Sequence, residues 1–157
     1  RFRYVSGVQT FAITISFLFH TIRYGMGYLR RRHSMNAWFL GAGIAAALVA
    51  LIHLVLGGRE IARPTLTLCE MPSVVRYTNY FCWHLVTLAL TLMSTGFFYS
   101  VHPGHPPEPA AAALLFSCGS ALLCFGVNFR FGLNHAHHPQ WALFLPVAAL
   151  GAIGFLP

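Results

Sequence analysis

The chain has 157 residues, of which 57% are hydrophobic and only 8% are charged, with a formal net charge of +7. A soluble domain carries about a quarter charged residues, so this composition indicates a helical bundle solvated by lipid. All ten basic residues are arginine, and Lys and Asp are absent. The absence of Lys excludes Schiff-base and P-loop chemistry, and the absence of Asp removes the usual carboxylates of phosphoryl transfer. The arginines cluster near the ends of apolar runs, which favours anionic headgroups over nucleic acid as their partner.

The apolar runs predict an all-α fold, a polytopic integral membrane bundle with four core transmembrane helices and one N-terminal span. A helix needs about 20 apolar residues to cross a bilayer, and runs near that length are expected at residues 5–28, 37–56, 78–100, 109–129 and 139–156. We therefore expect two units, residues 1–36 with the first span and a basic turn, and residues 37–157 with the four-helix bundle. The expected location is a bacterial inner membrane or an organelle membrane of bacterial descent.

Local signals predict where these helices begin and end. Gly57 and Gly58 indicate a helix stop after the second span, while Thr78 and Asn79 are candidate caps at the start of the third. The connection between them is too polar to cross the membrane and is expected to lie along its surface. Pro146 is expected to kink the fifth span.

The first span is the least apolar of the five. Its polar residues share one helical stripe, made of Gln9, Ser16, His20 and Arg23. This stripe is predicted to pack on another membrane subunit or on the bundle, and the alternative is a proton path or a pigment ligand.

His53 and His84 are predicted to lie at the same depth in adjacent antiparallel helices. His53 stands four residues before Gly57, and His84 stands four residues after Tyr80, which places each about 6 Å inside its expected helix end. Small residues precede His53 on its helical face, at Ala50, Ala46 and Gly43. Hydroxyl residues follow His84 on its helical face, at Thr87, Thr91 and Ser94. Such a pair could hold a haem, a chlorin or a metal ion. The alternative is that each imidazole makes an interhelical hydrogen bond.

A second group of histidines follows the fourth span, at His135, His137 and His138. An antiparallel zigzag would bring this group to the same side of the membrane as His53 and His84. Clustered histidines suit metal ions, with Glu60 as a candidate fourth ligand. The spacing differs from that of the histidine boxes of membrane di-iron hydroxylases, and a polar loop in the headgroup region is the alternative.

The fourth span carries polar residues at helical spacing. Ser117, Ser120, Cys124 and Asn128 recur along it and, together with Gly119 and Gly126, predict a packing face. A substrate pathway is not indicated, since charged or broken midplane helices and duplicated halves are not evident.

From Ile52 to Trp141 the chain resembles a group of small, uncharacterised bacterial multi-spanning membrane proteins. The resemblance rests on three short motifs: a histidine followed by G-x-R in IHLVLGGREIARP, a Trp-His pair in CWHL, and a late H-P-x-W in HPQW. It implies no activity, but it groups His53, Arg59, Trp83, His84, His138 and Trp141 as one set.

Three classes of function remain. The first is a non-catalytic integral membrane subunit that scaffolds or stabilises a larger complex, respiratory, photosynthetic or similar, whose partners are the lipid bilayer and other membrane subunits or a homo-oligomer. The second is a redox protein that binds haem, a metal ion or a chlorin through His53 and His84. The third is a small proton-linked carrier. The small size and the short loops favour the first.

Overall fold

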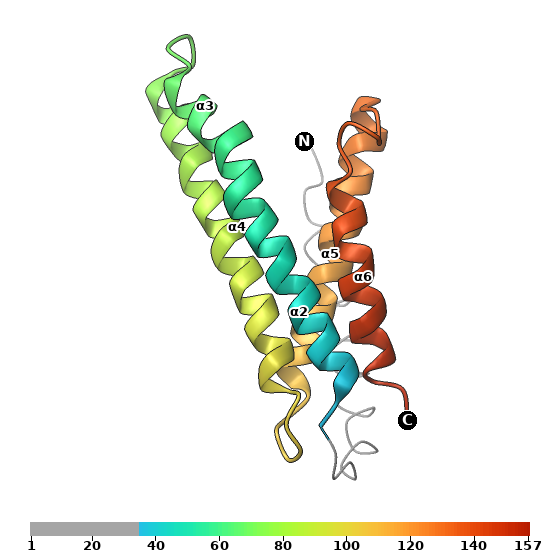
Figure 1. The fold of residues 1–157 in the computed structure, drawn as a ribbon. Coiled ribbons are helices and arrows are strands. Elements are labelled where there is room, and N and C mark those ends of the chain that lie inside the picture. Colours follow the sequence, from blue (N-terminus) through green and yellow to red (C-terminus); the bar gives the residue numbers. More distant parts are fainter. Residues whose placement is uncertain (1–34) are drawn as a thin grey trace, which may run out of the picture.

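A computed structural model describes residues 35–157 of the chain. This part is helical throughout, without a strand, and its helices run alternately up and down (Figure 1). The first predicted span at residues 5–28 lies outside the described residues.

Four helical segments form the bundle. The first is one continuous helix of 31 residues, made of α2 (Ala37–Ile52), the π-helix η1 (His53–Ala62) and α3 (Arg63–Thr67). It is followed by α4 (Ser73–Tyr99), α5 (Glu108–Phe131) and α6 (Gln140–Ile153). Three of the four, all except α6, are long and apolar enough to cross a membrane. The all-α class and the membrane-compatible helices are thus confirmed, while the total of five spans stays a prediction, since α6 has only 14 residues.

The predicted helix stop at Gly57 and Gly58 is wrong. The helix continues through both glycines in a π-helical conformation and ends at Thr67. Glycine weakens a helix by only about 1 kcal/mol, and the continuation packs against the start of α4. The expected surface connection is therefore mostly helix, and only residues 68–72 link the two segments.

The predicted start of α4 is also wrong. The helix begins at Ser73 instead of near Thr78, and its first residue follows Pro72, whose extended backbone ends the preceding turn. Thr78 and Asn79 are therefore interior residues of α4 and cap nothing. Proline just before a helix is a common start signal because it cannot donate a backbone hydrogen bond.

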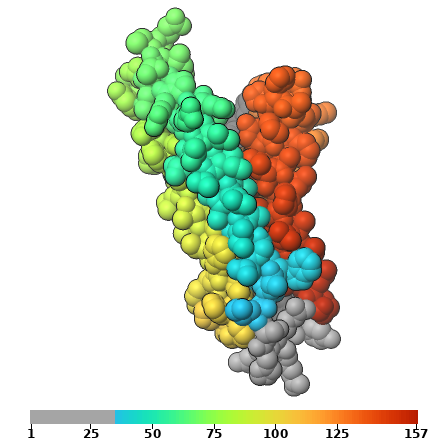
Figure 2. Space-filling view, viewed as in Figure 1, coloured from blue at the N-terminus to red at the C-terminus, as the bar shows by residue number. Residues whose placement is uncertain are grey.

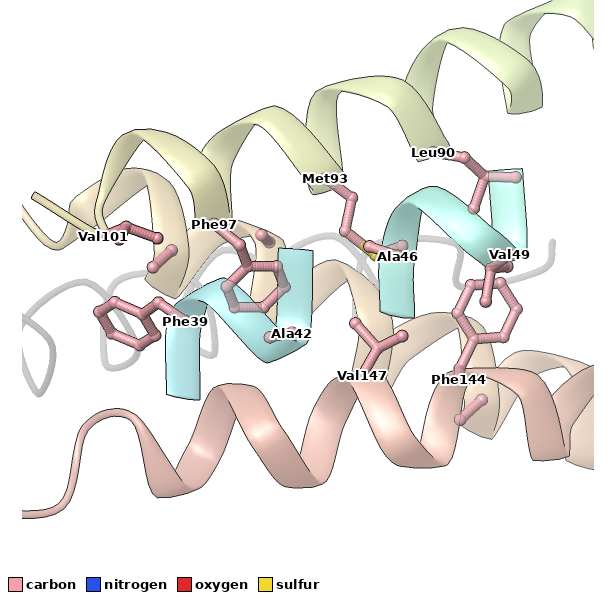
Figure 3. Close-up of a cluster of buried hydrophobic side chains, with 13 residues drawn as sticks. Phe39, Ala42, Ala46, Val49, Leu90, Met93, Phe97, Val101, Phe144 and Val147 are labelled. Carbon is pink, nitrogen blue, oxygen red and sulfur yellow. The ribbon is translucent and has the colours of Figure 1, made fainter. Parts of the chain in front are cut away.

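A compact core joins the four helices in the lower half of the bundle (Figure 3). Ala42 and Ala46 of α2 are fully buried and allow the neighbouring helices to approach closely, while aromatic side chains from those helices fill the space between them. The principal members are Phe39, Ala42, Ala46, Val49, Leu90, Met93, Phe97, Phe144 and Val147. The small-residue stripe before His53 therefore faces the core, as its spacing predicts.

Two buried hydroxyls add hydrogen bonds between helices. Ser94 of α4 donates to the carbonyl oxygen of Gly43 in α2 at 3.0 Å. Ser117 of α5 donates to the carbonyl oxygen of Phe144 in α6 at 3.1 Å. Each serine thereby ties one helix pair together at a point where water cannot compete.

Asn36 closes the lower end of the bundle. Its side-chain oxygen caps α2 by accepting from the backbone N–H groups of Trp38 and Phe39. Its side-chain nitrogen donates to the carbonyl oxygen of Gly154 at 2.8 Å, and its backbone N–H donates to Val101. One residue thus joins the start of α2, the end of α6 and the α4–α5 turn.

At the opposite end the bundle opens into two hairpins. In the lower half α2 packs on both α4 and α6, whereas η1 and α3 pack mainly on α4. The hairpin of α2, η1, α3 and α4 therefore leans away from the hairpin of α5 and α6, and the space-filling view shows a notch between their upper ends (Figure 2).

Candidate functional site

His53 and Trp83 form a stacked pair that joins η1 to α4. The ring centroids are 3.6 Å apart and the planes differ by 15°. The Nε2 atom of His53 lies 3.3 Å from the carbonyl oxygen of Trp83. Since a carbonyl oxygen only accepts, Nε2 carries the proton and donates. The structure thus shows the interhelical hydrogen bond that the sequence left as an alternative.

Gly57 provides the space for this pair. A Cβ atom at this position would lie 2.5 Å from Cη2 and 3.0 Å from Cζ3 of Trp83. At the adjacent Gly58 the nearest atom of the same ring would be 4.0 Å away. Gly57 therefore acts as a close-packing site for the indole, which explains why glycine occurs within this helix.

His84 has a different neighbour from His53. Its ring meets Tyr80 edge to face at a centroid distance of 4.5 Å, and the residue is exposed. His53 stacks on Trp83, which is the residue before His84 in α4. The structure therefore places His53 and His84 at one level, but each has its own aromatic partner. Ligation of a haem, chlorin or metal ion by His53 stays a prediction, and ligation through Nε2 requires the loss of its hydrogen bond to Trp83.

The loop between α5 and α6 holds the second histidine group. The side-chain nitrogen of Asn128 donates to the carbonyl oxygen of His138 at 2.8 Å and lies 3.5 Å from Nδ1 of His135. The His135 ring also stacks on Phe125 at 5.2 Å and meets the edge of Trp141. Buried Asn128 thus fixes the loop, and His135 belongs to an aromatic cluster at the end of the hairpin.

The predicted metal-ligand set is not brought together. Among residues 35–157, no group of three or more His, Cys, Asp or Glu side chains is arranged to hold a metal ion. Glu60 belongs to η1 on one hairpin, whereas His135, His137 and His138 belong to the α5–α6 loop on the other. His53 and His84 lie in the interior of their helices, 14 residues before the end of α3 at Thr67 and 11 residues after the start of α4 at Ser73. At 1.5 Å of rise per residue this is about 16–21 Å from those helix ends, so the predicted depth of about 6 Å is wrong. His135, His137 and His138 lie in the α5–α6 loop, so the five histidines form two separate groups.

The predicted partner-packing stripe lies outside the described residues. Gln9, Ser16, His20 and Arg23 all belong to residues 1–34, so their packing stays a prediction.

The polar stripe of α5 divides into an inner and an outer set. Ser117 and Asn128 are buried and bond to the α6 side of the hairpin. Gly119 and Gly126 lie on the open side of α5, where an added Cβ atom would meet none of the described residues within 4 Å. Within residues 35–157 these glycines therefore do not share the face on which Ser117 and Asn128 pack, and their role in packing stays a prediction.

The open side of α5 has a heptad pattern that we call the α5 seam. Small residues recur every seven positions at Ala112, Gly119 and Gly126. A large apolar residue stands three positions after each, and all six residues are exposed, with exposed fractions of 42% at Leu115, 72% at Leu122 and 79% at Phe129. This seven-residue spacing can be read from the sequence, but the polar stripe of α5 overlaps it and led to a different predicted packing face.

Comparison of the chain with protein-family models, with curated proteins and with solved structures found no match. The resemblance to the small bacterial multi-spanning proteins therefore stays a prediction, and the function is argued from the residues themselves.

Proposed function

We propose that this chain is a non-catalytic integral membrane subunit that scaffolds or stabilises a larger membrane complex, and that it packs against its partner helix through the α5 seam. The observation that carries the proposal is the heptad of small and large residues on the open side of α5. A repeat of 3.5 residues is the pattern by which two helices pack side by side over several turns.

The composition of the seam suits a helical partner better than lipid. In a bilayer no hydrophobic driving force pushes helices together, so association depends on close van der Waals packing, which small residues allow. Gly119 and Gly126 form hollows between Leu115, Leu122 and Phe129. Lipid tails gain nothing from a glycine in a helix, whereas the side chains of a facing helix can enter such hollows.

The weak self-burial of the helices supports the same proposal. In the most apolar stretch of each of the three long helices, only 22–28% is buried within residues 35–157. Most of the surface of these helices is therefore not covered by this part of the chain, as expected of a subunit that packs on others. The cofactor alternative has less support, because the Nε2 atom of His53 is already committed to Trp83.

The test fills the hollows of the seam without disturbing the fold. In the double variant G119L/G126L the added Cβ atoms meet none of residues 35–157 within 4 Å, so the far-UV circular dichroism of the purified chain should stay unchanged. Native gel electrophoresis of membranes solubilised in mild detergent should then show the chain moving from its complex to a smaller species.

A matched control introduces the same side chain elsewhere. Ala152 is exposed on α6, away from the seam, and A152L should leave the size of the complex unchanged. The proposal is wrong if G119L/G126L folds and migrates with the wild-type complex, or if A152L disrupts assembly to the same degree.

A further inference from the structure

We infer that the tip of the first hairpin, formed by the end of η1, α3 and the start of α4, binds the headgroups of anionic phospholipids through Arg59, Arg63 and Arg76. This inference does not depend on the proposed role of the α5 seam. It rests on the depth of these arginines, on their lack of carboxylate partners and on the aromatic residues beside them.

The depth of the tip follows from the length of the first helix. No charged residue occurs from Ala37 to Gly58, and this stretch is long enough to cross the roughly 30 Å hydrocarbon core. Arg59 is the first charged residue after it, and Arg63 follows one turn later. With Ala37 at one boundary of the hydrocarbon, both guanidinium groups reach the phosphate level at the other.

The arginines of the tip are not neutralised by the protein. Within the described residues, Arg59 and Arg63 have neither an ion pair nor a side-chain hydrogen bond, and both are exposed. Glu60 and Glu70 lie nearby in sequence but pair with no arginine of this part of the chain. Adjacent positions on a helix point in different directions, so Glu60 does not cover Arg59. The guanidinium groups are available to an external anion.

Arg76 approaches the same tip from α4. Its Nη1 atom donates to the carbonyl oxygen of Leu68 at 3.3 Å, and its guanidinium carbon lies 5.2 Å from the ring centroid of Tyr77. Its Nε atom is buried without a hydrogen-bond partner in the described structure. Tyr77 and Tyr80 are exposed beside it, as expected of aromatic residues at a membrane surface. Planar guanidinium groups are well suited to bidentate binding of phosphate.

The test is native mass spectrometry of the purified full-length chain with an equimolar mixture of phosphatidylglycerol and phosphatidylcholine of matched acyl chains. The wild type should retain more phosphatidylglycerol than phosphatidylcholine. In R59Q and in R63Q this preference should fall roughly fivefold, since one arginine near the surface contributes about that factor to anionic-lipid binding. The variants R59K and R63K, which keep the charge, should retain most of the preference.

Arg130 provides the matched control, because it carries the same charge at the end of the other hairpin but is the single arginine of that hairpin, so it belongs to no cluster. R130Q should leave the lipid preference within twofold of the wild type. Equal retention of both lipids by the wild type overturns the inference without any variant. An unchanged preference in both R59Q and R63Q, or an equal fall in R130Q, overturns it as well.

Discussion

Substitution of Gly57 by alanine tests the stacked pair that joins η1 to α4. The added Cβ atom would lie 2.5 Å from the indole of Trp83, so the ring must move. It cannot move freely, because its other contacts include the His53 ring at 3.6 Å. Overpacking of this kind costs about 1–3 kcal/mol, and alanine recovers about 0.5–1 kcal/mol of helix propensity. The expected net loss for G57A is therefore about 0–2.5 kcal/mol.

Gly58 provides a control one residue away. Its added Cβ atom would lie 4.0 Å from the same ring, an ordinary contact, so G58A should gain about 0.5–1 kcal/mol from propensity alone. Reversible unfolding in mixed micelles of mild detergent and dodecyl sulfate, followed by circular dichroism, measures both free energies. G58A should exceed G57A by about 1–3 kcal/mol, which is the cost of the close contact.

A double-mutant cycle identifies the indole as the cause. In a W83L background the space beside Gly57 is larger, so G57A should lose its penalty and behave like G58A. If G57A and G58A change the unfolding free energy equally in the wild-type background, the close packing of Gly57 against Trp83 is wrong.

Four further substitutions test the packing of the lower half. G96A places a Cβ atom 2.8 Å from the carbonyl oxygen of Pro109. Because a backbone atom cannot rotate away, the free energy of unfolding should fall by about 1–3 kcal/mol in the same assay. A stabilised variant would contradict the α4–α5 contact. S94A and S117A each remove one interhelical hydrogen bond and should lower the free energy of unfolding by about 0.6–1.5 kcal/mol. Because the two serines act on different helix pairs, the two losses should add in the double variant. Strong non-additivity would show that the helix pairs are coupled. N36A removes both the cap of α2 and the bond to Gly154, so it should lose about 1–2 kcal/mol, and a loss near zero would mean that Asn36 does not hold the lower end.

The sequence predicts the broad fold because composition and apolar length determine it. A chain with 8% charged residues has far fewer charged groups than the surface of a soluble domain carries, and runs of about 20 apolar residues are typical of membrane helices. The small-residue stripe of Ala46 and Gly43 faces α4 and α6 as predicted, since helical spacing alone determines which residues share a face.

The helix ends could not be predicted because tertiary contacts decided them. Gly57 reads as a helix stop in isolation, but its missing side chain makes room for Trp83, a residue of another helix. The start of α4 differs from the predicted start for a similar reason. Because the first helix extends to Thr67, only residues 68–72 connect it to α4. Local signals describe only local preferences, and packing overrides them.

The candidate site was predicted only in part. The prediction that His53 and His84 lie near one level rests on antiparallel topology, and in the structure His53 stacks on Trp83, the residue before His84. The histidines form two groups because the first helix continues past Gly57 and Gly58 to Thr67 and α4 begins at Ser73, which places His53 and His84 in helix interiors. The sequence placed them near helix ends because it predicted both ends wrongly. The sequence placed Asn128 correctly on a packing face of α5. It did not predict the hydrogen bond from Asn128 to the carbonyl oxygen of His138, which fixes the α5–α6 loop.

The most direct test of the proposed subunit role is site-specific photocross-linking in native membranes. A photoreactive residue at Leu122, which is 72% exposed in the α5 seam, should give a discrete adduct with one partner protein or with a second copy of the chain. The same residue at Leu88, which is 57% exposed on α4 outside the seam, should react mainly with lipid. Lipid adducts alone from position 122, or identical protein adducts from both positions, would contradict the assignment of the seam as the interface.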